Sequence, residues 1–164
     1  MKSLKPPESH HLRAAEGWLE LGNHFEANEE LKKISLEWRF HPLVLLARWE
    51  IYAQGKHWEF AYTMAHGMVA MYPEDPIGYI KRSIALHAMK RTPEAWQSLL
   101  PATEKFPTNS VIAYDLSRYA SLLGRLDEAN NWLEKAMRFG DAKKIKMRAL
   151  EEPDLEPLWD HVLK

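Results

Sequence analysis

Four alanines recur along the chain with a spacing of 34 residues, each inside a stretch with helical periodicity: Ala27, Ala61, Ala95 and Ala129. Four residues after each of them stands a second apolar column, made of Leu31, Ala65, Leu99 and Leu133. Because a second column repeats with the same period, the spacing of the alanines is not a chance recurrence of one abundant residue. A 34-residue period that holds two short amphipathic helices predicts a helical solenoid, whose repeats stack and bury a shared seam.

Proline, glycine and polar residues follow the same period. Pro42 and Pro76 occupy the first position of predicted helices. His41 and Asp75 are predicted to cap these two helices. Asn109 is predicted to cap the equivalent helix of the next repeat. The turns inside the helical hairpins are expected at Gly22, Lys56, Lys90 and Gly124.

The apolar spacing predicts four helical hairpins, which pair 9–22 with 24–36, 42–54 with 57–72, 76–90 with 92–106, and 109–123 with 126–139. Pro101 lies inside the sixth of these helices and should kink it. Two further helices, 141–150 and 154–163, are expected to cover the apolar end of the stack. The predicted organisation is one domain of about ten helices, with a lead-in at 1–8, repeats at 9–142 and capping helices at 143–164.

This pattern resembles the tetratricopeptide repeat (TPR) family over residues 9–142. The resemblance is carried by Trp18-x-x-Leu21-Gly22, by Gly124-Arg125-Leu126-Asp127-Glu128-Ala129, and by Pro73 and Pro107. It implies an all-α, right-handed superhelical solenoid of antiparallel helix pairs. One departure stands out, because Trp49 occupies a column that is otherwise small, at Ala15, Ser83 and Ser117.

The resemblance also implies a binding site, since the first helix of each TPR pair lines a concave groove. Helical phase places ten residues on that groove: Leu12, Glu16, Leu46, Glu50, Ile80, Lys81, Ile84, His87, Tyr114 and Arg118. Such a groove is largely apolar and suits an extended or helical peptide. Apolar side chains would supply most of the affinity, while Glu50, His87 and Arg118 would select register and charge.

Composition excludes several other classes of function. The chain carries 22 basic and 23 acidic residues and no cysteine, so neither a bulk positive field nor thiolate chemistry is available. Motifs for nucleophilic catalysis, phosphate binding or a zinc site are absent from the sequence. We therefore expect a non-catalytic adapter or scaffold, without cofactor or metal, that is cytoplasmic, does not enter membranes and binds a protein or peptide partner.

Two alternatives remain open at this stage. The chain could self-associate, so that a homo-oligomer is the functional unit. A weaker alternative is the binding of RNA or another anionic ligand through the basic segment 143–148, although nucleic acid is not the expected partner. The seven tryptophans are expected to pack helix seams, with Trp18 in a core column, and not to form an aromatic cage.

Overall fold

The computed structural model of the protein describes residues 3–162. Within this range the regular structure is entirely helical, which confirms the predicted all-α fold. The chain divides into two compact units, residues 1–81 (unit 1) and residues 82–164 (unit 2).

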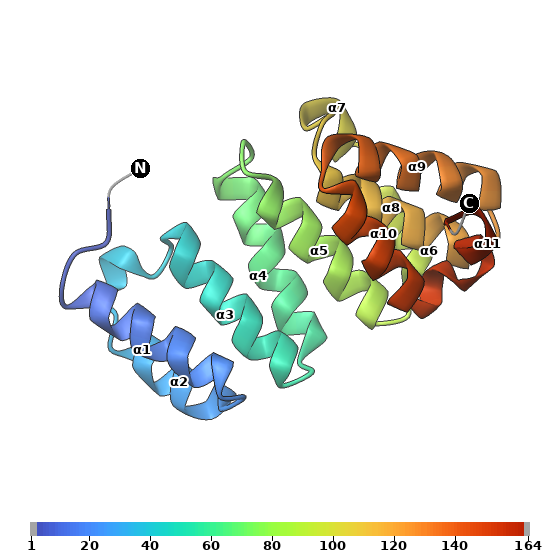
Figure 1. The fold of residues 1–164 in the computed structure, drawn as a ribbon. Coiled ribbons are helices and arrows are strands. Elements are labelled where there is room, and N and C mark those ends of the chain that lie inside the picture. Colours follow the sequence, from blue (N-terminus) through green and yellow to red (C-terminus); the bar gives the residue numbers. More distant parts are fainter. Residues whose placement is uncertain (1–2, 163–164) are drawn as a thin grey trace. The chain divides into compact units, whose positions relative to one another are not determined.

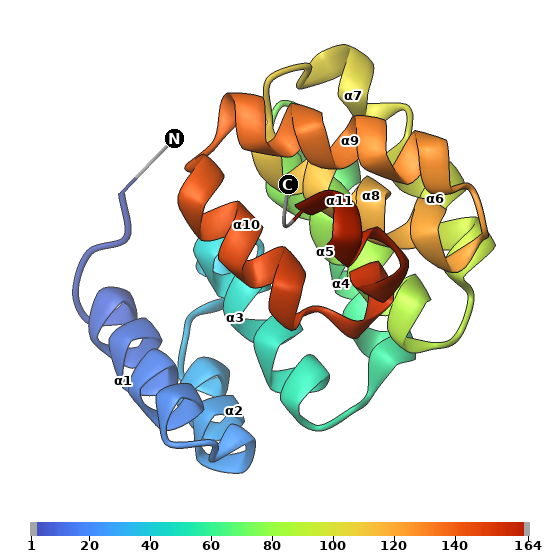
Figure 2. The same cartoon turned by 45° about the vertical axis from the view of Figure 1, so that its right-hand side comes forward.

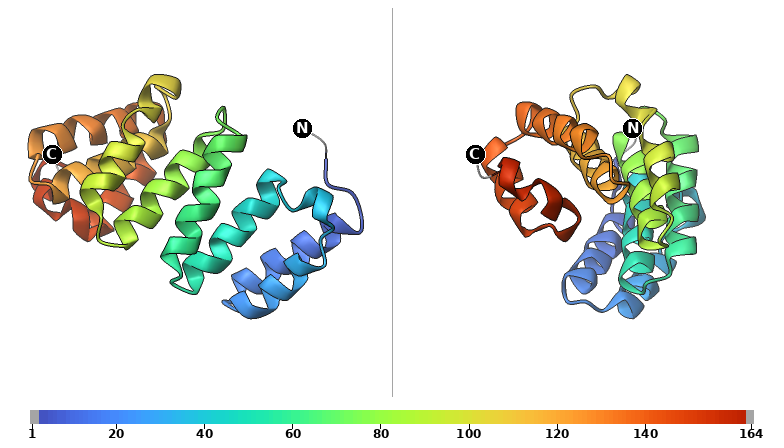
Figure 3. Two further views of the ribbon diagram at one scale, coloured as in Figure 1. Left: turned by 180° about the vertical axis from the view of Figure 1, so that it is seen from behind. Right: turned by 90° about the vertical axis from the view of Figure 1, so that its right-hand side faces the viewer.

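Unit 1 contains two antiparallel helical hairpins (Figure 1). Its elements are α1 (Glu8–Glu20), α2 (His24–Lys32), the 3-10 helix η1 (Leu36–Trp38), α3 (Pro42–Gln54) and α4 (Trp58–Met71). Helix α1 pairs with α2 and α3 pairs with α4, as the view from behind also shows (Figure 3). Helix α3 additionally packs against both α1 and α2, and the apolar faces of these three helices form a common core that includes Leu12, Leu31, Val44 and Ile51.

The division between the units falls within α5 (Pro76–Ala88). The elements that follow are α6 (Thr92–Leu99), α7 (Ala102–Lys105), α8 (Ser110–Leu122), α9 (Leu126–Phe139), α10 (Ala142–Glu151), the 3-10 helix η2 (Pro153–Leu158) and α11 (Trp159–Val162). Helices α8 and α9 form an antiparallel pair. Helix α10 packs against α9, and η2 packs against α8 (Figure 2), so the C-terminal segment of the described chain folds back onto this pair.

The alanine column lies where helices approach most closely. All four alanines, Ala27, Ala61, Ala95 and Ala129, are completely buried with 0% exposure. In the last hairpin the small column faces them directly, because the hydroxyl of Ser117 on α8 donates a hydrogen bond of 2.8 Å to the carbonyl of Ala129 on α9. The 34-residue period therefore marks the contact at which the two helices of a hairpin cross.

Trp49 is accommodated in the small column by a neighbouring aromatic ring. Its side chain is buried at 4% exposure and lies against Trp58 of α4, with ring centroids 6.4 Å apart. Trp96 is likewise buried, as expected for seam packing. The expectation for Trp18 was wrong, because this side chain is 36% exposed; the core contact at this end of α1 is made by the next residue, Leu19.

The predicted caps and turns are found at the expected residues. Backbone N–H groups donate to the side chains of His41, Asp75 and Asn109 at the starts of α3, α5 and α8. The four turn residues adopt the left-handed conformation, with φ of 74° at Gly22 and Gly124, 57° at Lys56 and 64° at Lys90. Two of the four positions therefore hold a lysine in a conformation that favours glycine.

Replacing Lys90 with glycine is expected to raise the free energy of unfolding by about 0.5 to 1 kcal/mol, because it relieves the left-handed backbone strain. Urea unfolding followed by circular dichroism measures the change. The control is Lys135→Gly in the interior of α9, which should lose about 1 kcal/mol from the lower helix propensity of glycine. Equal losses in both variants would show that the Lys90 turn carries no strain.

Some helix boundaries differ from the predicted ones for local reasons. Helix α2 ends at Lys32, four residues before the predicted end at 36, and the 3-10 helix η1 follows at Leu36–Trp38. Pro101 breaks the predicted helix 92–106 into α6 and α7, as its missing N–H requires. The predicted last helix, 154–163, is divided into η2 and α11 around Pro157, and residue 163 lies outside the described residues.

Candidate functional site

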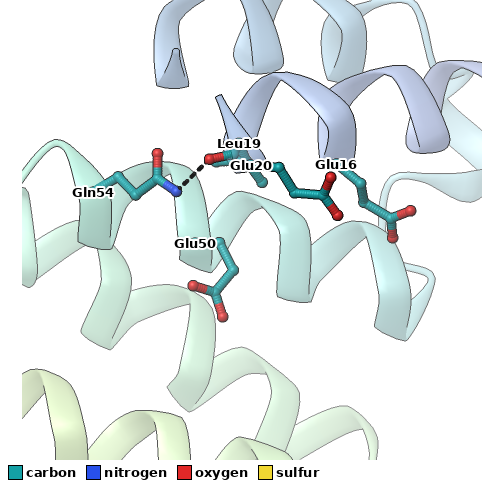
Figure 4. A pocket seen from close by; sticks show the side chains of 5 residues that line it. All are labelled: Glu16, Leu19, Glu20, Glu50 and Gln54. Atoms are coloured by element: carbon teal, nitrogen blue, oxygen red, sulfur yellow. Dashed lines mark hydrogen bonds between the residues drawn. The ribbon is translucent and has the colours of Figure 1, made fainter. Parts of the chain in front are cut away.

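Unit 1 contains a cavity between α1 and α3 that is lined mainly by carboxylates (Figure 4). Its volume is about 370 Å³, and its lining residues are Glu16, Leu19, Glu20, Glu50 and Gln54. Glu16 and Glu20 are one turn apart on α1, and Glu50 and Gln54 are one turn apart on α3, so each helix presents two polar side chains to the same space. Two of the predicted groove residues, Glu16 and Glu50, therefore share one site.

A hydrogen bond between the two helices lies beside these carboxylates. The amide of Gln54 donates a hydrogen bond of 2.9 Å to the carbonyl of Leu19, near the end of α1 (Figure 4). This carbonyl belongs to the last turn of the helix, where intrahelical donors run out. The bond fixes the C-terminal end of α1 against α3 and sets the width of the cavity.

The carboxylates of this cavity are only partly neutralised. Glu50 forms an ion pair of 2.6 Å with Lys81, whose ammonium also lies 4.1 Å from the centroid of the Trp49 ring. Glu16 and Glu20 are exposed and form no ion pair within the described part of the chain. The cavity therefore keeps an uncompensated negative charge that faces solvent.

A second cavity of about 450 Å³ adjoins the first and shares Glu16 with it. Its apolar lining comes from Leu4, Leu12 and Leu43, and Arg13 and His41 are among its polar residues. Leu12 is buried at 5% exposure, whereas Leu43 is 46% exposed. We call the two cavities together the α1–α3 trough. It has a leucine-lined end and an acidic end, with Glu16 between them.

The predicted groove residues of α8 lie in a different environment. Arg118 is enclosed by three carboxylates, at 3.5 Å from Asp115, 3.1 Å from Glu152 and 2.7 Å from Asp154. Tyr114 is buried at 2% exposure, with the guanidinium of Arg148 4.4 Å from its ring centroid. Since Glu152, Asp154 and Arg148 belong to the C-terminal segment, that segment covers the part of α8 that was expected to face a ligand.

His87 takes part in the same cluster. Its Nε2 lies 3.4 Å from Asp154, its Nδ1 lies 3.0 Å from the hydroxyl of Thr92, and its ring packs against Tyr119. Burial lowers the pKa of His87, so the neutral ring is favoured. The remaining predicted residues, Leu46, Ile80 and Ile84, are half-buried.

Burial also shifts the pKa values of the acidic groups on α8. It raises the pKa of Asp115 to about 6 and that of Tyr114 to about 12, because each charged form would be poorly solvated. The guanidinium groups of Arg118 and Arg148 oppose the shift of Asp115 but do not cancel it.

Unit 2 is expected to gain about 1 kcal/mol of stability from Asp115 as the pH falls from 7 to 5. The pKa of this group is raised in the folded state, so the folded chain binds a proton that the unfolded chain releases, and acidification favours folding. His87 acts in the opposite direction, because its pKa is lowered. Urea unfolding of the wild type and of Asp115→Asn at several pH values isolates the contribution of Asp115, and parallel pH profiles would contradict it.

Sequence reasoning missed Glu20, Gln54 and the acidic pair Glu152 and Asp154. The first two carry a usable signal, since each lies four residues after a predicted groove residue on the same helix. The acidic pair carries none, because only the return of η2 onto α8 brings it to Arg118.

The hairpins, their 34-residue column and the left-handed turns define a TPR-like helical-repeat fold. Solved structures of MamA, a TPR-containing protein, share it: MamA MSR-1 C2 has a TM-score of 0.64 at 16% identity and covers 83% of this chain and 78% of that chain. A MamA mutant has a TM-score of 0.61 at 17% identity and covers 81% of this chain and 77% of that chain. MamA AMB-1 C2221 has a TM-score of 0.60 at 18% identity and covers 81% of this chain and 78% of that chain. At these identities the likeness concerns the fold. Neither a family model nor a curated protein matches the chain.

Among residues 3–162, no three His, Cys, Asp or Glu side chains are grouped so that they could hold a metal ion. In the same range, each helix is too short or too polar to cross a membrane.

Proposed function

We propose that the protein is an interaction module and that the α1–α3 trough of unit 1 binds a segment of a protein partner. The segment would carry basic residues next to an apolar one. The observation that carries this proposal is the position of Glu16 and Glu20, two exposed carboxylates without an ion-pair partner in the described structure, beside a leucine-lined cavity. The likeness to TPR-like neighbours supports an interaction or scaffold role.

The two ends of the trough would have different roles. An apolar side chain placed against Leu4 and Leu43 would supply affinity by leaving water. Lysine or arginine side chains would meet Glu16 and Glu20, and these exposed charges would mainly select the register and the sign of the partner. Lys81 already shows this type of contact inside the chain, because its ammonium binds Glu50 and lies over Trp49.

The proposed site includes only part of the groove that the sequence predicts. The predicted residues on α8 and His87 are engaged with the C-terminal segment, whereas Glu16 is exposed. We therefore assign the binding role to the trough of unit 1. A role for the remaining predicted residues in contacting the partner stays a prediction.

A peptide selection experiment tests the proposal. The protein is immobilised and offered a displayed library of random peptides, and the selected sequences are compared with those selected by Glu16→Gln/Glu20→Gln. The wild type should enrich peptides in which lysine or arginine lies within one helical turn of an apolar residue, and the variant should lose this enrichment. The matched control, Glu37→Gln/Glu59→Gln, changes two other exposed carboxylates of unit 1 and should select as the wild type does.

Enrichment of acidic or purely apolar peptides would overturn the proposal, and so would an unchanged selection in Glu16→Gln/Glu20→Gln. Binding of the selected peptides, measured by fluorescence anisotropy, should weaken as salt is raised, because exposed charges are screened beyond about 10 Å at 0.1 M ionic strength.

A further inference from the structure

The outer face of α10 has the chemistry that the α1–α3 trough is proposed to recognise. The inner face of this helix is packed, with Ala149 completely buried. The opposite face is exposed and carries Lys143, Lys144 and Met147, the last with 56% of its surface accessible. Met147 lies four residues after Lys143, so the thioether and the two ammonium groups share one turn and a half of helix surface.

These cations are available to a partner. Lys143 forms no ion pair in the described structure, and Lys144 has only a long contact of 3.5 Å with Asp141, with 84% of its own side chain exposed. Arg148 is different, because its guanidinium lies over the ring of Tyr114. Glu151 marks the C-terminal end of the same exposed face, so the positive charge is concentrated in the first turn and a half of α10.

We propose that the partner of the trough is a second copy of this chain, which inserts the outer face of its α10. This inference rests on the proposed function of the trough. Lys143 and Lys144 of one copy would pair with Glu16 and Glu20 of the other, and Met147 would enter the leucine-lined end beside Leu43. Each side consists of two like charges within one helical turn and an adjoining apolar contact, so the two surfaces are complementary in charge and each places an apolar contact next to its charges.

The geometry of this contact decides the type of assembly. The trough belongs to unit 1 and α10 belongs to unit 2, so the two sides of the interface are different surfaces of the same chain. Such a heterologous contact leaves one free trough and one free α10 on every pair of copies. The assembly is therefore expected to grow head to tail, into a closed ring or an open filament, and not to stop at a symmetric dimer.

Charge reversal in the full-length chain tests the inference. Sedimentation velocity is measured over about a hundredfold range of protein concentration, since association shifts with concentration by mass action. The wild type should show a mass that rises with concentration and falls with salt. Glu16→Lys/Glu20→Lys alone and Lys143→Glu/Lys144→Glu alone should each raise the dissociation constant at least about tenfold, because like charges then meet at the contact.

The decisive sample is the equimolar mixture of these two reversed variants. A reversed trough is positive, so it repels the wild-type α10 of its own variant and attracts the reversed, negative α10 of the other variant. Association between the two variants should therefore return in the mixture. The chain with all four substitutions should associate alone. The control Lys135→Glu/Arg138→Glu changes the charge of α9 by the same amount and should associate as the wild type does. Circular dichroism verifies that each variant is folded.

Three outcomes would overturn the inference: a wild type that stays monomeric at every concentration, association that survives both reversals, or no recovery in the mixture. These outcomes can be distinguished from a failure of the proposed function of the trough. A monomeric wild type that still selects basic peptides keeps the trough as a site for another protein. Loss of basic peptide selection would remove the site itself.

Discussion

Replacing Arg118 with leucine is expected to lower the free energy of unfolding by about 3 to 5 kcal/mol. The guanidinium joins α8 to the C-terminal segment, through Asp115 on its own helix and through Glu152 and Asp154 on the segment. Asp115 is 2% exposed, so the variant would leave a buried carboxylate without its ion-pair partner. Urea unfolding at pH 7 measures the loss.

Two further variants separate the buried charge from the shape of the side chain. Adding Asp115→Asn to Arg118→Leu removes the carboxylate that would be left unpaired, and should recover part of the loss. Arg125→Leu removes an exposed arginine that lies 3.7 Å from Glu128 and should cost less than about 1 kcal/mol. If Arg118→Leu costs no more than this exposed pair, the cluster on α8 does not stabilise the unit.

Replacing Leu155 with alanine is expected to cost about 2 to 5 kcal/mol, because it opens a cavity under η2. Leu155 and Leu158 are buried at 0% and 1% exposure, and they pack the C-terminal segment against the α8 and α9 pair. The indole of Trp159 also donates a hydrogen bond of 2.9 Å to the carbonyl of Ala149. Hydrogen exchange of residues 150–160 should rise in the variant, together with the loss measured in urea.

The control for Leu155→Ala is Leu126→Ala, at a leucine that is 43% exposed and should cost less than about 1 kcal/mol. Faster exchange that is confined to residues 150–160 would mean that the segment detaches by itself. An unchanged exchange pattern together with an unchanged unfolding midpoint would contradict the role of Leu155.

The repeat architecture could be predicted from the sequence because its signals are local. The alanine column, the caps at Asp75 and Asn109 and the left-handed turn at Lys90 each depend on a few neighbouring residues. Pro101 announces the break between α6 and α7 for the same reason. The buried alanine and the turn residue recur four times with the period of 34 residues.

The site was harder to predict because helical phase says which face a residue occupies and not what covers that face. Phase places Glu16 and Arg118 in the same column of the repeat, yet Glu16 is exposed and Arg118 is enclosed by Glu152 and Asp154. The difference comes from residues 142–162, which lack the repeat pattern and return onto α8 and α9. A non-repeating segment has no column to which its residues can be aligned, so its packing partner could not be derived from the period.

The hydrogen bond from Gln54 to Leu19 has a consequence for the rates of binding. Because it holds α1 against α3, binding of the proposed partner would need no slow rearrangement of the trough, and the encounter would be limited by diffusion and orientation. The unpaired carboxylates Glu16 and Glu20 would then accelerate the approach of a cationic segment by long-range attraction. Added salt should therefore slow association far more than it speeds dissociation, while loss of the Gln54 amide should mainly shorten the lifetime of the complex.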